Sequence, residues 1–252
     1  MARRILVVLA LLCALPASAL AQGAAPAAEG PAVDPKALEI IKAMSDRLSS
    51  ARRLSFRARA VYDVPGKDKT PIYYATVSDV YFARPNMLRV MTVADGPMSE
   101  LAYDGKDVAV FSPTENTLAS GPAPDTIEGT IRLVEEGGID LPFADVLLND
   151  SYKNFSEGLT SAFIIGQSDA VGGTRTDIVS IASPDAHAQL WIGARDRLPR
   201  QIWVTYTKAP GSPRHVVEFN GWRLNGPPRG SYFPRRVLAR ASRTSFPPPK
   251  AP

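Results

Sequence analysis

The sequence of 252 residues contains a single cysteine, Cys13, which lies in an apolar run close to the N-terminus. If this run is removed during export, the mature chain has no thiol. Disulfides, zinc–thiolate sites and cysteine nucleophiles are then excluded from the mature protein. A domain without such links must be held together by its hydrophobic core, and about 230 residues are enough to bury a core in one domain.

Histidine is also scarce, and the residue patterns of common active sites are missing. The two histidines, His187 and His215, do not stand in a His-Glu-x-x-His pattern or in another close metal-ligand spacing. A Ser–His–acid triad would need one of them, but the chain has no Gly-x-Ser-x-Gly motif. Glycine-rich loops that bind dinucleotides or phosphates are missing too. We therefore expect no catalytic residue, no metal and no cofactor, and we place both histidines on strands as surface or lining residues.

No apolar run is long enough to cross a membrane as a helix. Arg3 and Arg4 precede an apolar run from Ile5 to Leu15, whereas a membrane-spanning helix needs about 20 residues. The small-residue stretch Ala19-Leu20-Ala21 follows this run. Basic residues, a short apolar run and small residues in this order are typical of a secretory signal peptide. We predict cleavage after Ala21 and a periplasmic location; a membrane anchor is the alternative.

Composition sets the boundaries of the expected domain. Residues 22–33 are mostly Ala, Gly and Pro, with a single charge, and have too little apolar bulk to offset the entropy of ordering. Residues 246–252 form a Pro-rich tail. The predicted organisation is a signal peptide at 1–21, a disordered leader at 22–33, a single domain at 34–245 and the tail at 246–252.

The domain is predicted to begin with an amphipathic helix and to continue as a strand. Asp34 is a good N-cap and Pro35 fits the first helical position. Apolar residues near helical spacing then extend the helix to about Ser50, namely Leu38, Ile41, Met44 and Leu48. Afterwards every second residue is apolar, from Leu54 through Phe56, Ala58, Ala60 and Tyr62 to Val64. This alternation predicts a strand with one solvated face.

Most of the remaining chain reads as strands bounded by Gly and Pro clusters. The further strands are expected at residues 72–83, 87–93, 101–103, 108–111, 114–120, 161–168, 174–183, 187–192, 200–206, 214–224 and 232–242. Two short mid-chain helices interrupt them, the first carrying Ile127, Ile131 and Val134 and the second beginning at Pro142 with Phe143, Val146 and Leu147. The predicted fold class is mainly β: a long, curved antiparallel half-barrel of about eleven strands, with the N-terminal helix and the two short helices on its concave side.

The central hairpin from His187 to Tyr206 has large apolar residues on both faces, and several other strands share this feature. One face must pack on the core, and part of the other must be covered by helices or must line a cavity. An apolar concave side under helices can hold an acyl chain, although complete coverage without a cavity is the open alternative. The candidate ligand-lining residues are Phe56, Tyr62, Tyr74, Phe82, Leu190, Ile192, Ile202 and Val204. The carboxylates Glu135, Glu136, Asp145 and Asp150 are interpreted as solvated helix faces rather than as a glycosidase-like pair.

Charge is distributed unevenly along the chain. Residues 22–185 contain 15 Lys and Arg against 23 Asp and Glu, whereas residues 186–252 contain 12 against 2. The simpler interpretation is that basic C-terminal strands close onto acidic earlier ones. The alternative is a basic face for an acidic partner or an anionic membrane surface. A nucleic-acid partner is not expected, because no recognised binding motif accompanies the arginines.

Four segments in a fixed order resemble the bacterial lipoprotein-carrier (LolA/LolB-like) superfamily and, within it, the predicted periplasmic family called domain of unknown function 2092. These segments are Asp34-Pro35-Lys36-Ala37-Leu38, Arg84-Pro85-Asn86-Met87-Leu88-Arg89, Tyr103-Asp104-Gly105-Lys106, and Leu190-Trp191-Ile192 with Leu198-Pro199-Arg200. The resemblance covers about Asp34 to Ser242. It implies a concave hydrophobic surface and, by analogy, binding of lipid or of acylated protein. It supplies no catalytic residue, because one fold can support unrelated functions.

Three functions are compatible with these observations. The first is an exported, non-catalytic protein, expected to be a monomer, that binds or carries a lipid, an acyl chain or a lipoprotein in an apolar pocket. The second is a non-catalytic interaction module that uses a basic C-terminal face including Arg235, Arg236 and Arg240. The third, an enzyme of the cell envelope, requires a cleft in which polar groups converge around a histidine or a carboxylate pair.

Overall fold

A computed structural model describes residues 33–68, 70–226, 241–244 and 246 of the chain. The chain consists of two units, Met1–Gly30 and Pro31–Pro252, and everything described below belongs to the second unit. The expected signal peptide, most of the leader, most of the tail and most of the expected strand 232–242 lie outside the described residues.

Within the described residues, twelve strands form one sheet. Their bounds are β1 Arg53–Pro65, β2 Pro71–Ala83, β3 Met87–Ala94, β4 Ser99–Tyr103, β5 Asp107–Ser112, β6 Thr117–Pro122, β7 Ser161–Ser168, β8 Thr176–Ala182, β9 Ala186–Gly193, β10 Pro199–Tyr206, β11 Arg214–Leu224 and β12 Ser242–Thr244. The order in the sheet is β12-β6-β5-β4-β3-β2-β1-β11-β10-β9-β8-β7.

This order consists of two antiparallel meanders joined in the middle. Strands β1 to β6 pair in sequence order, as do β7 to β11, and β1 pairs with β11 to make the sheet continuous. Strand β12 pairs in parallel with β6 at one end, and β7 forms the other end. The expected mainly antiparallel, open sheet is confirmed.

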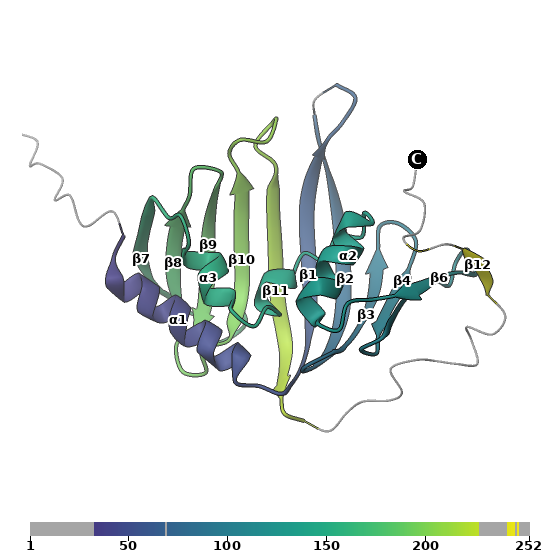
Figure 1. Cartoon of the computed structure of the whole chain (residues 1–252). Coiled ribbons are helices and arrows are strands. Elements are labelled where there is room, and N and C mark those ends of the chain that lie inside the picture. Colours follow the sequence, from purple (N-terminus) through teal and green to yellow (C-terminus); the bar gives the residue numbers. More distant parts are fainter. Residues whose placement is uncertain (1–32, 69, 227–240, 245, 247–252) are drawn as a thin grey trace, which may run out of the picture. The chain divides into compact units, whose positions relative to one another are not determined.

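Helical segments cover one face of this sheet. They are α1 Pro35–Ser49, α2 Ile127–Glu136, the 3-10 helix η1 Ala144–Val146 and α3 Ser151–Ser156. Figure 1 shows α1, α2 and α3 in front of the same face, with the strands curving behind them. The side chains of Asp34, Thr126 and Asp150 accept hydrogen bonds from backbone N–H groups in the first turns of α1, α2 and α3. The second mid-chain helix expected from Pro142 is only the single turn η1, and α3 follows it as an element that the sequence did not predict.

The core lies between these helical segments and the inner face of the sheet. Helix α1 buries Ile41, Met44 and Leu48 of the expected stripe together with Ala37, whereas Leu38 is only partly buried. Strand β1 buries alternate residues, Leu54, Phe56, Ala58 and Ala60, which is the alternation that the sequence predicted. Each fully buried large apolar side chain contributes about 1.5–3 kcal/mol relative to exposure. The core is therefore a continuous layer under the helices, as expected for a domain without disulfides.

A β-bulge changes which side chains of β11 reach this layer. The pairing of β1 with β11 shifts between Ser55 and Arg57, opposite Gly221, whose φ of 65° is one that glycine adopts easily. Trp222 thereby joins the inner face, where its ring centroid lies 4.4 Å from that of Phe56. Its Nε1–H donates a hydrogen bond to the Pro199 carbonyl over 2.9 Å.

The outer face of the sheet is partly apolar. Trp191 and Trp203 lie there with ring centroids 6.1 Å apart, and Trp203 is 46% exposed. At the turns and strand ends, basic residues of the C-terminal part pair with acidic ones, namely Arg197 with Asp177, Arg200 with Asp196 and Lys208 with Asp185. Among the helices of the described residues, none combines the length and the apolar character required to cross a membrane.

Candidate functional site

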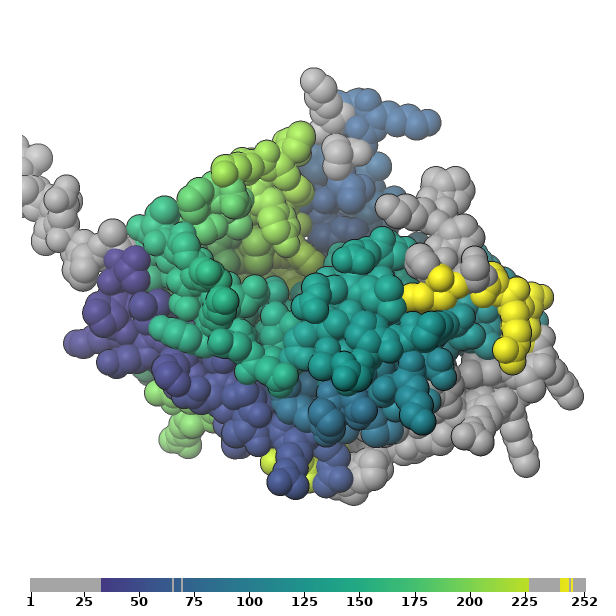
Figure 2. Space-filling model, in the orientation of Figure 1, coloured from purple at the N-terminus to yellow at the C-terminus, as the bar shows by residue number. Residues whose placement is uncertain are grey.

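A cavity of about 370 Å³ remains where the helical cover of the sheet ends. It lies between the ends of β1, β10 and β11 on one side and the segment from α2 to η1 on the other. In Figure 2 the surface is hollowed between the light-green strands and the teal helical segment. The lining residues are Tyr62, Asp63, Glu135, Asp140, Leu141, Pro142, Ala144, Asp145, Tyr206, Pro213, Arg214 and His215.

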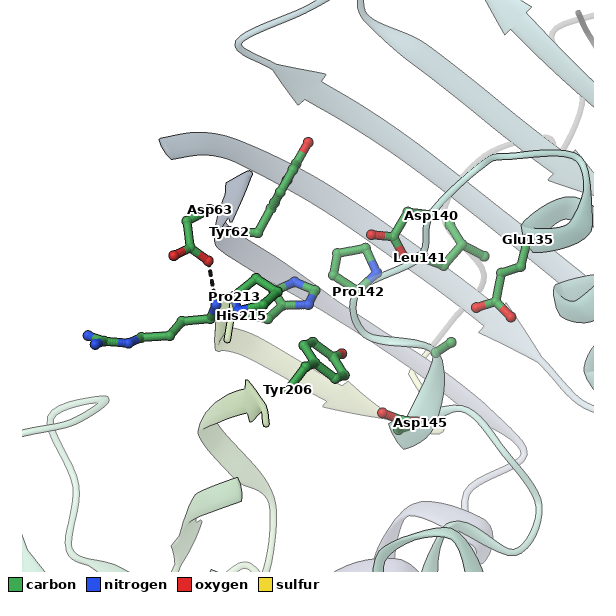
Figure 3. A pocket seen from close by; sticks show the side chains of 12 residues that line it. Tyr62, Asp63, Glu135, Asp140, Leu141, Pro142, Asp145, Tyr206, Pro213 and His215 are labelled. Carbon is green, nitrogen blue, oxygen red and sulfur yellow. Dashed lines mark hydrogen bonds between the residues drawn. The ribbon is translucent and has the colours of Figure 1, made fainter. Parts of the chain in front are cut away.

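The floor of the cavity is a row of rings set by strand register. Tyr62 of β1 lies opposite Tyr74 of β2 and opposite His215 of β11. The ring of Tyr62 lies 5.9 Å from each of these rings, stacked on Tyr74 and edge-on to His215. Tyr206, the last residue of β10, completes the aromatic side (Figure 3). All of these residues occupy positions that continue the inner-face alternation beyond the helical cover.

The opposite wall of the cavity belongs to the wall segment, which runs from Glu135 to Asn149. Helix α2 ends at Glu136, and Gly138 adopts a φ of 85°, which turns the chain toward the cavity. The side chains of Asp140 and Pro142 then lie beside the floor, as Figure 3 shows. The next residue, Phe143, is 1% exposed and packs edge-on against Phe56 at 5.8 Å. One side of this segment thus faces the cavity, while apolar side chains of the same segment, such as Phe143, are buried in the core.

This wall is anchored at its far end by polar contacts. The guanidinium of Arg84 lies 4.7 Å from the ring centroid of Phe82 and donates hydrogen bonds to the side chain of Asn149 and to the Leu147 carbonyl. The N–H of Asn149 donates to the carboxylate of Glu128 over 2.9 Å. These contacts tie the end of the wall segment to the β2–β3 turn and to α2.

Two carboxyl groups of the wall, those of Glu135 and Asp145, have raised pKa values. Burial raises the pKa of Glu135, and the neighbouring charges of Asp140 and Asp145 raise it further. Burial also raises the pKa of Asp145, although this residue keeps part of its surface exposed to the cavity and accepts a hydrogen bond from Asn154 Nδ2 over 2.7 Å. The wall thus gathers acidic groups whose charged forms are disfavoured by burial and by their neighbours.

The floor is neutral. Burial lowers the pKa of His215, and this effect outweighs the charges of Asp140 and Asp145, which act in the opposite direction. Its Nε2 atom is buried and has no hydrogen-bond partner among the described residues. Burial raises the pKa of Tyr62 and of Tyr206, so both phenols keep their protons at neutral pH. Within the described residues, no three His, Cys, Asp or Glu side chains are placed to hold one metal ion.

A family model described as "Predicted periplasmic protein (DUF2092)" matches residues 37–245. The chain belongs to this DUF2092 family. The family that the sequence segments suggested is therefore confirmed, and the family description agrees with the expected periplasmic location. A comparison with proteins of curated function found no match.

Several solved structures are similar to this DUF2092 chain. LprF from Mycobacterium bovis is 13% identical, with a TM-score of 0.45 over 76% of this chain and 94% of LprF. A chain of the Pseudomonas aeruginosa MucA/MucB complex is 12% identical, with a TM-score of 0.43 over 85% of this chain and 67% of that chain. A LolA superfamily protein from Nitrosomonas europaea is 12% identical, with a TM-score of 0.28 over 76% and 94%. At TM-scores below 0.5, these similarities carry no argument about ligands.

The eight residues predicted to line a ligand site lie in two environments. Five are buried in the core of the DUF2092 chain under the helices, namely Phe56, Phe82, Leu190, Ile192 and Ile202. Tyr62 lines the cavity, Tyr74 stacks on it, and Val204 lies opposite His215 in the pairing of β10 with β11. Contact of any of these residues with a ligand stays a prediction.

The four carboxylates interpreted as solvated helix faces lie in different places. Glu135 and Asp145 are exposed on α2 and η1 and also line the cavity, whereas Glu136 is exposed outside it and Asp150 caps α3. The sequence did not indicate that the turn after α2 brings Glu135 and Asp145 beside the ends of β1 and β11. Of the two histidines, only His215 lines this cavity, and its partners come from distant strands. The alternation in residues 214–224 was the one sequence signal for its position.

Proposed function

We propose that this DUF2092 chain is a non-catalytic periplasmic protein that binds an amphipathic ligand, either a lipid, a free acyl chain or an acylated protein. The observation that carries this proposal is the position of the cavity. The inner face of the sheet is filled by the helices and by apolar side chains up to the point where the cavity of about 370 Å³ opens. That volume lies within the range of about 300–1,000 Å³ that is common for small-molecule sites.

The lining suits a ligand with one apolar and one polar part. The rings of Tyr62 and Tyr206, together with Leu141 and Pro142, offer apolar surface, while the carboxylates lie on the other side. Leu141 is 5% exposed and belongs to the core, so the apolar part of the cavity is continuous with the layer beneath the helices. A short apolar chain would lie against these residues with its polar end toward the carboxylates.

A longer acyl chain would need more room than the cavity provides. The side chain of Phe143, directly behind the wall, fills the space next to Phe56. Carrying a long chain would therefore require the wall segment to move away from the sheet and an acyl chain to take the place of Phe143. Exchanging one set of apolar contacts for another costs little in hydrophobic burial.

The test uses mature protein that is expressed with its own signal and purified without detergent. Native and denaturing mass spectrometry would detect a lipid that co-purifies, and uptake of a fluorescent fatty acid would be measured in parallel. Ala144 lines the cavity and carries only a methyl group, so Ala144→Trp is expected to fill it and to abolish uptake. Thr205→Trp, on the outer face of β10, is the matched control and is expected to bind normally. An apo mass without uptake would contradict the proposal.

Export through a cleavable signal peptide is part of the same proposal. It is supported by the basic, apolar and small-residue pattern of the first 21 residues and by the family description. The intact mass of the exported protein is expected to correspond to a chain that begins at Gln22. A retained N-terminus would contradict cleavage after Ala21.

A second candidate function is an interaction module that uses basic C-terminal residues. The excess of 12 Lys and Arg over 2 Asp and Glu in residues 186–252 supports it. Arg197, Arg200 and Lys208 already pair with acidic residues of this chain, so the residues in question are Arg235, Arg236 and Arg240, which lie outside the described residues. Charge reversal of these three should remove a partner from pull-downs, and unchanged pull-downs would contradict this function.

A further inference from the structure

Three carboxylates of the wall line one cavity without a counter-ion among the described residues, whereas several other acidic residues pair with an arginine or a lysine. Asp79, Asp177 and Asp196 each pair with an arginine over 2.5–2.7 Å. Within the described residues, Glu135, Asp140 and Asp145 form no ion pair, although they line the same cavity. Three carboxylates around one opening repel one another, and that repulsion is relieved when a cation binds between them.

Few other charged groups of the cavity lining can neutralise the negative charge of the wall carboxylates. Asp63 is the fourth acidic residue of the lining. Its carboxylate already accepts a hydrogen bond from the backbone N–H of Arg214. Arg214 is the one cationic side chain of the lining, and it is exposed and carries no ion pair in the described part of the chain. His215 stays neutral because burial lowers its pKa. The cavity therefore keeps a net negative charge without a ligand.

The opposite side of the cavity is built from groups that favour a nitrogen cation. The rings of Tyr62 and Tyr206 present electron-rich faces, which attract ammonium and guanidinium groups. His215 lines the same side and, because burial lowers its pKa, its neutral ring adds no positive charge there. Carboxylates on one wall and aromatic rings on the other form a complementary enclosure for such a group.

We propose that the amphipathic ligand carries a cationic nitrogen, an ammonium or a guanidinium group, which binds between the carboxylates of Glu135, Asp140 and Asp145 and the rings of Tyr62 and Tyr206. This inference rests on the proposed function, because it names the polar group of the same ligand. The cavity volume and the apolar part of the lining suit a cation attached to an apolar chain better than a bare ion. Candidates of this chemistry are an aminolipid, or a lysine or arginine next to an acylated residue of a protein.

Three probes with equal chains separate the inference from the function on which it rests. Decylamine, decanol and decanoate share a ten-carbon chain and carry a positive, neutral and negative head group. Each is titrated into the mature protein at neutral pH, below its micelle concentration, and followed by calorimetry. We expect decylamine to bind at least about tenfold more tightly than decanol, because one charge-assisted contact is worth about a factor of ten, and decanoate to bind most weakly.

The variants remove the charge without changing the shape of the cavity. The double variant Glu135→Gln with Asp140→Asn is expected to reduce the preference for decylamine over decanol by roughly tenfold or more, while decanol binds as before. Glu136→Gln is the matched control, because Glu136 is adjacent on α2 and is exposed outside the cavity. Thermal unfolding of each variant shows that it is folded under the binding conditions.

Each outcome decides one of the two proposals. If none of the three probes binds, the proposed function fails. If decanol or decanoate binds as tightly as decylamine, the function stands and the cationic head group is overturned. If decylamine is preferred but the double variant keeps that preference, the cation binds elsewhere and the inference is also overturned. A preference that the double variant loses and Glu136→Gln keeps supports it.

Discussion

Tyr62 and His215 face each other across β1 and β11, with ring centroids 5.9 Å apart and an angle of 66° between the rings. Their contact is set by strand pairing between residues 153 positions apart in the sequence. It places a neutral imidazole under the acidic wall formed by Asp140 and Asp145, whose charges favour the protonated ring while burial opposes it. Protonation of His215 is therefore one way in which solution pH acts on the fold.

We predict that His215 makes the protein less stable as the pH falls. In the unfolded chain histidine takes up a proton near pH 6.5, whereas burial lowers the pKa of His215 in the folded state. The unfolded chain thus binds the proton first, and the free energy of unfolding decreases as the pH falls below about 6.5 through the folded pKa. His215→Gln is expected to flatten this dependence between pH 7.5 and 5.

Urea unfolding at several pH values measures this effect, and His187→Gln, on the outer face of β9, is the matched control. Glu135 and Asp145 also face this region, and because their pKa values are raised, they stabilise the folded state as the pH falls. They are present in both variants, so their contribution cancels in the comparison. An unchanged slope in His215→Gln would contradict the assignment of the effect to His215.

A second prediction concerns the aromatic cluster behind the wall. The ring of Phe56 lies 4.4 Å from Trp222 and 5.8 Å from both Phe143 and Phe219. Phe56→Ala removes the shared partner of all three and should lower the free energy of unfolding by about 3–5 kcal/mol. Phe163→Ala is the control, because this side chain is 48% exposed on the edge strand β7, and it should cost less than about 1 kcal/mol. Urea unfolding of both variants checks the difference, and equal losses would contradict it.

The parts of the fold that depend on local pattern could be predicted from the sequence. Residues 54–64 alternate strictly, and β1 has the expected inner face. Asp34 and Pro35 mark the start of α1 because capping and a fixed φ act within one turn. The bulge at Gly221 could not be predicted, because it depends on the pairing of β11 with β1. Trp222 consequently lies on the inner face although the regular alternation places it outside.

The candidate site depends even more on tertiary structure. The cavity is formed by β1, β10, β11 and the segment after α2, and no local pattern indicates that these meet. Asp145 follows an apolar stretch and is exposed on η1, which agrees with its interpretation from the sequence. Its position opposite Tyr206 across the cavity depends on the turn at Gly138 and could not be predicted (Figure 3).

A third prediction tests how the wall is held. Arg84 donates hydrogen bonds to Asn149 and Leu147 at the end of the wall segment, and burial lowers its pKa, so its environment is partly desolvated. Arg84→Ala should lower the free energy of unfolding by about 1–3 kcal/mol, because it removes hydrogen bonds that a charged, partly desolvated group donates. Arg52→Ala, an exposed arginine before β1, is the control and should change stability by less than about 0.5 kcal/mol. A similar loss in both variants would show that Arg84 does not anchor the wall.

The last prediction separates stability from binding at Asp145. Burial raises the pKa of Asp145, so at neutral pH its charge destabilises the folded state, and this cost disappears as the pH falls through the raised pKa. Asp145→Asn removes the charge and keeps an oxygen that accepts the hydrogen bond from Asn154. We expect a gain of less than about 1 kcal/mol at pH 7, because solvent screens a partly exposed charge, and a smaller gain at pH 4.

The thermal unfolding midpoint at the two pH values measures that gain, which should be at most about 2–4 °C in a domain of this size. The same variant should bind decylamine more weakly, because it removes one of the three carboxylates that enclose the cation. A residue with a purely structural role would not produce this combination, since its replacement would either destabilise the fold or leave binding unchanged. A stabilised variant with weakened binding is the result expected when a protein keeps an unfavourable charge for the benefit of its ligand.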